Sequence, residues 1–254
     1  MKVSLVSLPI TSGRPEVNQA KMEQLLRSAV TQGAELVCFP EMAIVNDGYP
    51  WGKYRHLAQP IPGEYSDTFC RLARECGVHI SLGLMEATPE GFYSSAILIS
   101  PDGRIILKHR QVRSGKPYVC GDAFNCVESG LGPVMFAICA DIWDDGLLTR
   151  VAQCRPRYTL VPADLCGNEN ERGLITDERP PDDLLELKER YRTISEASGG
   201  TVLVANCYEE DGPEYCGAFG GAFAFDKGVE VLPLGLTARR WRQPVEQPIY
   251  SFAL

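Results

Sequence analysis

The chain has 254 residues, a formal net charge of −8 at neutral pH and a hydrophobic share of 44%. A chain of this length and composition can bury one large core, so we expect a single domain over residues 1–254. The acidic balance argues against a nucleic-acid surface, because binding to phosphates depends mainly on lysine and arginine. The short basic run at residues 239–242 is the only counter-signal, and it is typical of a solvated loop or a subunit contact.

No segment of the sequence indicates export, a membrane span or a bound metal. The first residues read as a strand interrupted by Pro9, and no run approaches the roughly 18 apolar residues of a membrane helix. We therefore expect a cytoplasmic protein. The ten cysteines show none of the close pairs of zinc sites, which predicts mostly reduced thiols, no disulfide framework, no metal and no cofactor.

The first half of the chain predicts strands that alternate with helices and then form a hairpin. Apolar residues at helical spacing predict helices at residues 17–30 and 66–76. The expected strands are residues 2–8, 34–39, 78–85, 94–99 and 104–108. The last two flank Pro101-Asp102-Gly103, a strong turn sequence.

The second half continues the mixed pattern. One helix is expected at residues 182–198, and Asp141, Asp144 and Asp145 are expected to cap a helix that follows them. The expected strands are residues 134–139, 158–161, 201–205, 222–225 and 229–232. This order indicates one mixed sheet or two sheets with helices outside. The polar segment at residues 165–183 fits a mobile loop and an active-site lid equally well.

Two of the expected strands end on chemically unusual residues. The sequence Val-Cys-Phe-Pro-Glu places Glu41 just beyond a buried strand, and Phe-Ala-Ile-Cys places Cys139 at the end of another. Catalytic groups gather at such ends because the side chains leave the core while the sheet holds them rigidly. Either residue alone is weak evidence, since such a glutamate is usually solvated and a buried cysteine is usually inert.

Taken together, the motifs resemble those of the nitrilase, or carbon–nitrogen hydrolase, superfamily. They are FPEM at residues 39–42, PDGRIILKHR at residues 101–110, ICADIW at residues 138–143, VAN at residues 204–206 and the Gly220-Gly221 pair. Their order and spacing match that superfamily over nearly the entire chain, and ICADIW looks closest to its glutamine-hydrolysing domains. The resemblance implies an α/β fold, a four-layer αββα sandwich, in a homodimer or higher homo-oligomer.

The resemblance also implies roles for individual residues. Glu41 takes the place of the general base, Cys139 takes that of the nucleophile, and a lysine on the strand after the hairpin would complete a Glu-Lys-Cys triad. Asn206 would support the site. A carboxylate near a thiol can remove its proton during attack on an amide carbon, and the backbone N–H of Ala140 is placed to stabilise the resulting oxyanion. Tyr49 and Trp51 are candidate substrate contacts, although packing or interface roles are more typical of such residues.

The sequence departs from the superfamily at the lysine. Aligned without gaps on Gly103, the segment GRIILKHRQ places His109 where tyrosine is common and Gln111 where the catalytic lysine belongs. If the strand continues, Arg113 shares a face with Gln111 and is the best substitute cation on the strand. Lys116 in the following loop is the best flexible substitute.

Three functions remain open from the sequence. The first is hydrolysis of a small amide through a thioester intermediate, with an altered Glu-Gln-Cys site. The second is a catalytically silent binding or regulatory subunit, and the third is acyl transfer, in which an amine resolves the thioester. Retention of both Glu41 and Cys139 favours an enzyme, since a silent site has no chemical need for either. The expected partner is a small-molecule amide, with no nucleic acid and no membrane.

Overall fold

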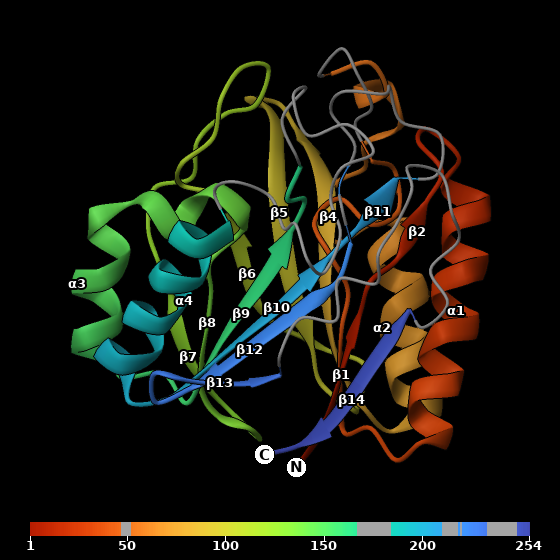
Figure 1. Cartoon of the computed structure of the whole chain (residues 1–254). Helices are drawn as coiled ribbons and strands as arrows, with labels where there is room; N and C mark the ends of the chain where they lie inside the picture. The colour runs from red at the N-terminus through yellow and green to blue at the C-terminus, as the bar shows by residue number, and fades with distance from the viewer. Residues whose placement is uncertain (47–51, 167–183, 210–217, 219, 233–247) are drawn as a thin grey trace.

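Two β-sheets lie face to face, and a pair of helices covers the outer side of each (Figure 1). The computed structural model describes residues 1–46, 52–166, 184–209, 218, 220–232 and 248–254. The helices are α1 (Pro15–Thr31) and α2 (Glu64–Cys76) on one side, and α3 (Asp145–Cys154) and α4 (Leu184–Ser198) on the other. The predicted four-layer αββα sandwich is confirmed.

The first sheet has six strands in the order β14-β1-β3-β4-β5-β6. Its strands are β1 (Lys2–Val6), β3 (Leu36–Cys38), β4 (His79–Thr88), β5 (Gly91–Ile99), β6 (Ile105–Arg110) and β14 (Ile249–Ala253). The neighbours β1, β3 and β4 run parallel, whereas β4, β5 and β6 form an antiparallel meander. Its β5–β6 hairpin is the one that the Pro101-Asp102-Gly103 turn predicts.

The second sheet also has six strands, in the order β13-β12-β10-β9-β8-β7. They are β7 (Cys126–Ser129), β8 (Gly132–Phe136), β9 (Tyr158–Ala163), β10 (Thr201–Asn206), β12 (Ala222–Asp226) and β13 (Val229–Leu232). Strands β8, β9 and β10 are parallel, so the residues that follow them leave the same edge of the sheet. A small parallel pair joins β2 (Pro9–Ile10) to β11 (Tyr208–Glu209).

Three apolar clusters fill the three spaces between the four layers. The middle cluster packs one sheet on the other and includes Leu5, Leu98, Phe136, Leu160 and Leu203. The two outer clusters pack α1 and α2 on the first sheet, and α3 and α4 on the second. Central strands are thus buried on both faces, which is why they read as nearly continuous apolar runs in the sequence.

The structure corrects several expected boundaries. The strand expected at residues 134–139 ends at Phe136, because Cys139 opens the short 3-10 helix η2 (Cys139–Trp143). Asp144 caps α3 by accepting a hydrogen bond from the Gly146 N–H, but Asp141 does not cap that helix. The edge strands β7 and β14 were not expected at all, because they are short and only partly buried.

Two further findings concern the whole described chain. No helix among the described residues is long and apolar enough to cross a membrane. The nine cysteines within the described ranges are all free thiols. The basic run at residues 239–242 and most of the segment at residues 165–183 lie outside the described residues.

Candidate active site

Glu41 lies three residues beyond β3, in a buried turn at the carboxyl end of this central strand of the first sheet. Its side chain is 6% exposed, and the Ser94 hydroxyl donates a 2.6 Å hydrogen bond to Oε1. Burial, and then the negative charge of Asp164, raises the pKa of Glu41 to about 8, against the opposing effect of hydrogen bonds from Ser94 and Cys139. The next residue, Met42, has a left-handed backbone with φ of 43°, which turns the chain sharply after the carboxylate.

Cys139 lies at the corresponding end of β8 in the second sheet and is itself left-handed, with φ of 41°. A non-glycine residue in this region is strained and persists only where its surroundings hold it. The thiol donates to the backbone carbonyl of Asp164 at a sulfur–oxygen distance of 3.8 Å. Burial, followed by the negative charge of Glu41, raises the pKa of the Cys139 thiol well above its ordinary value. The resting Cys139 side chain is therefore a neutral thiol beside a carboxyl group.

Gln111 reaches from the first sheet to the turn at residues 138–141, which carries Cys139, in the second. It follows directly after β6, is buried, and donates from its backbone N–H to the Ser94 carbonyl at 2.8 Å. Its side-chain Nε2 donates to the Ile138 carbonyl at 3.0 Å. An amide nitrogen carries two hydrogens, so one such bond leaves a second donor on the residue that replaces lysine.

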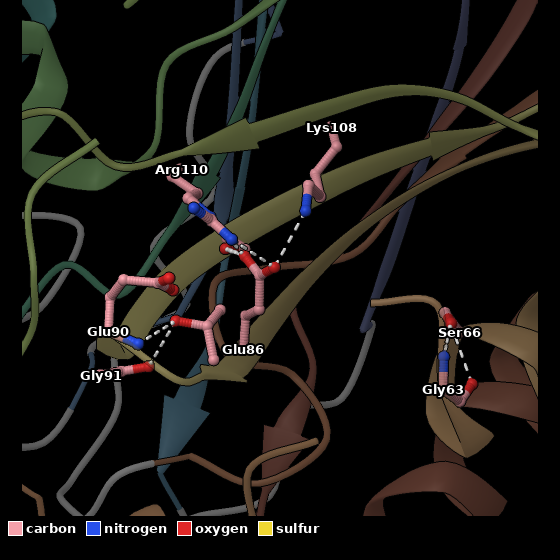
Figure 2. Close-up of polar contacts among 9 residues, drawn as sticks. Gly63, Ser66, Glu86, Glu90, Gly91, Lys108 and Arg110 are labelled. Atoms are coloured by element: carbon pink, nitrogen blue, oxygen red, sulfur yellow. Dashed lines mark hydrogen bonds and ion pairs between the residues drawn. The ribbon is translucent and has the colours of Figure 1, made fainter. Parts of the chain in front are cut away.

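Lys108 and Arg110 point away from this site. Figure 2 shows both side chains converging on Glu86, with nitrogen–oxygen distances of 2.9 Å for each. Burial alone would raise the pKa of Glu86, but hydrogen bonds from Arg110, Ser95 and Lys108 outweigh it and lower the pKa to about 2. Side chains alternate along a strand, so Lys108 and Arg110 lie on the face opposite to that of Gln111 and pair there with Glu86. Lys108 therefore does not take the place of the lysine expected at position 111.

Asp141 is the polar centre of the site, with no exposed surface and hydrogen bonds to four donors. Oδ1 accepts from the backbone N–H groups of Val112 at 2.7 Å and Arg113 at 2.9 Å. Oδ2 accepts from the Ile138 N–H at 2.9 Å and from His109 Nε2 at 2.8 Å, with the ring as donor because an ionised carboxylate only accepts. His109 therefore pairs with Asp141 and not with Cys139. The Asp141 carboxylate thus joins the end of β6 to the turn that carries Cys139.

A cavity of about 280 Å³ opens over these residues. Six of the residues predicted from the sequence line it together: Glu41, Gln111, Arg113, Lys116, Cys139 and Ala140. Arg113 and Lys116 are exposed and lie on the loop that follows β6, which is no longer a strand at that point. Arg113 therefore lies beyond the end of β6 and does not share a strand face with Gln111 as expected, although it does line the cavity.

Asn206 does not line the cavity but holds a neighbouring segment in place. Its Oδ1 accepts from the Leu165 N–H at 2.7 Å, and its Nδ2 donates to the Gly220 carbonyl at 2.9 Å. These bonds fix the segment that follows β9. Tyr49 and Trp51 lie outside the described residues.

Asp164 is a cavity residue that the sequence reading missed. It follows β9 directly and lines the cavity beside Cys139 and Glu41. The signal was present, since an aspartate after an apolar run is the same pattern that singled out Glu41. It was overlooked because the expected strand stopped at Val161, whereas β9 continues to Ala163.

The carbon-nitrogen hydrolase family profile matches residues 2–155. This chain belongs to the carbon–nitrogen hydrolase family. Among curated proteins, it is 26% identical over 155 residues to the omega-amidase NIT2 of Xenopus tropicalis, covering 56% of this chain and 55% of that protein. It is 29% identical over 157 residues to a formamidase of Bacillus thuringiensis (strain Al Hakam), covering 58% and 46%. The chain thus matches about half the length of these relatives.

Solved structures of the nitrilase superfamily share the fold. An amidase of Nesterenkonia AN1 superposes with a TM-score of 0.73 at 20% identity, covering 93% of this family member and 87% of that chain. A carbon-nitrogen hydrolase of Helicobacter pylori G27 gives a TM-score of 0.79 at 17% identity, with 93% and 86% covered. Saccharomyces cerevisiae Nit3, of the same superfamily, gives 0.75 at 19%, with 91% and 84% covered.

The four bonds to Asp141 predict that Asp141→Ala lowers the free energy of unfolding by about 3–5 kcal/mol, because buried donors lose a charged acceptor. Urea unfolding followed by circular dichroism measures this loss. Asp145→Ala is the matched control: the Asp145 side chain is fully exposed and makes a long 3.9 Å ion pair with Arg190, so its loss should cost less than about 1 kcal/mol. Equal midpoints for the two variants would contradict the role assigned to Asp141.

Proposed function

We propose that this protein hydrolyses a small amide through a thioester on Cys139, with Glu41 as general base. The observation that carries the proposal is the sharing of one cavity by a partly buried thiol and a buried carboxyl group from opposite sheets. The cavity volume of about 280 Å³ lies near the lower end of the range for ligand pockets and suits a small-molecule substrate. The amidase and formamidase names of the relatives support the same substrate class.

The chemistry begins with proton transfer. The ionised Glu41 takes the Cys139 proton as the sulfur attacks the amide carbon, which avoids a free thiolate in a buried site. The carbonyl oxygen becomes an oxyanion, for which the Ala140 backbone N–H and the second Nε2 hydrogen of Gln111 are the candidate donors. Glu41 returns the proton to the nitrogen, the C–N bond breaks, and ammonia leaves a thioester. Water, deprotonated by Glu41, then releases the acid and restores the thiol.

Gln111 makes the proposed triad neutral at its third position. Its amide can donate a hydrogen bond but brings no charge to the oxyanion. We assign a supporting electrostatic role to Arg113 and Lys116, the cations that line the cavity among the described residues. The Arg113 guanidinium is held by a 3.3 Å hydrogen bond to the Trp143 carbonyl, whereas Lys116 lies on an exposed part of the loop. Lys116 therefore has more freedom to approach a bound substrate.

Ammonia release from a panel of small amides, including formamide and succinamate, tests the proposal. The wild type should release ammonia, Cys139→Ala should release none, and Glu41→Gln should lose about 10²–10⁴ in kcat/KM through loss of the base. Cys76→Ala removes a thiol at the end of α2, outside the cavity, and serves as the matched control with unchanged rate. Binding of amides without turnover would support a silent binding subunit. Product formation only with an added amine would support acyl transfer.

The raised pKa of Glu41 predicts the direction of the pH dependence. Only the ionised carboxylate can accept the thiol proton, so kcat/KM should rise with pH through about pH 8 and then level off. An unperturbed carboxylate would instead complete this rise below pH 6. A pH series of initial rates, with enzyme stability checked at each pH, measures this rise in kcat/KM. A rate that is flat from pH 6 to 9 would exclude Glu41 as the titrating base.

A further inference from the structure

Three thiols contact Asp164 beside the cavity. The Cys139 sulfur lies 3.8 Å from the Asp164 carbonyl oxygen, and the Cys166 sulfur lies 3.6 Å from the same oxygen. The two sulfurs are therefore no further apart than these two distances together. The Cys207 sulfur lies 3.1 Å from Asp164 Oδ1, which the Cys166 sulfur also approaches at 3.6 Å. The proposed nucleophile thus has a second thiol close to it on one backbone carbonyl.

The fold holds Cys166 in this place. Strands β8 and β9 are parallel neighbours, so the chain leaves both at the same edge of the second sheet. Cys139 lies three residues beyond the end of β8, and Cys166 lies three residues beyond the end of β9. The backbone at Cys166 is fixed twice, because Asn206 Oδ1 accepts the Leu165 N–H at 2.7 Å and Cys166 forms an antiparallel bridge with Ala218. The approach of the two thiols is therefore built into the sheet.

Exposure separates the two thiols from the third. Cys139 and Cys166 are each partly exposed, whereas Cys207 is fully buried. Cys139 also lines the cavity, which admits a small oxidant. A thiol that is oxidised alone passes from sulfenic acid to the irreversible sulfinic and sulfonic acids. A neighbouring thiol stops this sequence, because it condenses with the sulfenic acid to give a disulfide that reductants can open.

We propose that Cys166 is the resolving thiol of Cys139, so that hydrogen peroxide converts the pair into a reversible disulfide. This redox modification goes beyond the proposed function. Glu41 takes the Cys139 proton while the sulfur attacks one peroxide oxygen. The O–O bond breaks, the hydroxide recovers the proton as water, and Cys139 becomes a sulfenic acid. The Cys166 sulfur then attacks the Cys139 sulfur, and the S–OH group leaves with the Cys166 proton as a second water.

The disulfide has a direct consequence for the site. Cys139 in a disulfide has no free thiol with which to attack an amide, so hydrolysis stops. A thiol reductant restores Cys139 and with it the activity. The modification is thus a protective one, since it replaces an irreversible loss by a reversible one.

The first experiment treats the wild-type protein with hydrogen peroxide in small molar excess. The remaining thiols are capped with N-ethylmaleimide, and the peptides are mapped without reduction. We expect a peptide pair joined through Cys139 and Cys166, and two fewer capped thiols than in the untreated protein. Dithiothreitol should restore at least about nine-tenths of the Cys139 thiol and of the ammonia release.

Two serine variants identify the resolving thiol in the same assay. In Cys166→Ser, peroxide should take Cys139 to the sulfinic or sulfonic acid, and dithiothreitol should restore less than about one-tenth of its thiol. Cys207→Ser is the matched control, because it removes a buried thiol that contacts the same aspartate. It should form the Cys139–Cys166 disulfide as the wild type does. Circular dichroism shows whether each variant is folded.

The peptide map of the wild type decides the inference whether or not the variants fold. A disulfide between Cys139 and Cys207 overturns it, and so does oxidation of Cys139 to the sulfinic acid without any disulfide. A Cys139 thiol that peroxide leaves unchanged overturns it as well. The thiol measurements need no turnover, so a failure to release ammonia would overturn the proposed function and leave the disulfide result standing.

Discussion

The arrangement of the site depends on one buried carboxylate, Asp141. A charge without solvent contact is costly unless hydrogen bonds replace its water, and here four donors do so. Two of these donors belong to the chain leaving the first sheet, and one belongs to the turn that carries Cys139. The cost of burying the charge is therefore offset only when both sheets are in place. This couples the geometry of the nucleophile to the packing of the whole sandwich.

The strained backbone of Cys139 follows from the same constraint. Asp141 donates its own N–H to the Ile138 carbonyl at 2.8 Å and accepts the Ile138 N–H on its side chain, which closes a tight turn around the nucleophile. Gln111 donates to that same carbonyl and so enters the cavity. The turn sets the sulfur above the sheet edge, where Glu41 faces it from the other sheet. The two reacting groups thus meet across the interface between the sheets.

The apolar patterns predicted most strands and helices, because buried central strands and amphipathic helices leave clear signals. They left one sheet or two open, and the four layers came from the family resemblance. The edge strands β7 and β14 were missed because their apolar pattern is weak, whereas the edge strands β6 and β13 were found because each follows a clear turn sequence. Glu41 and Cys139 were found because each follows an apolar run. Asp141 was expected to cap a helix, since Asp144 lies nearby, whereas three of its four partners lie 28 to 32 positions earlier and local patterns do not reveal them. Asp164 depended on one strand boundary, and Arg113 on a strand that ends at Arg110.

The proposed mechanism requires Cys139 to carry the acyl group during turnover. Intact-mass measurement after rapid acid quenching, with a hydrolysed amide in excess, detects this intermediate. We expect an added mass equal to the acyl group minus one hydrogen, located on Cys139 by peptide mapping and decaying in water after the amide is removed. Release of ammonia with no adduct at any quench time, or with the adduct on another residue, would contradict it.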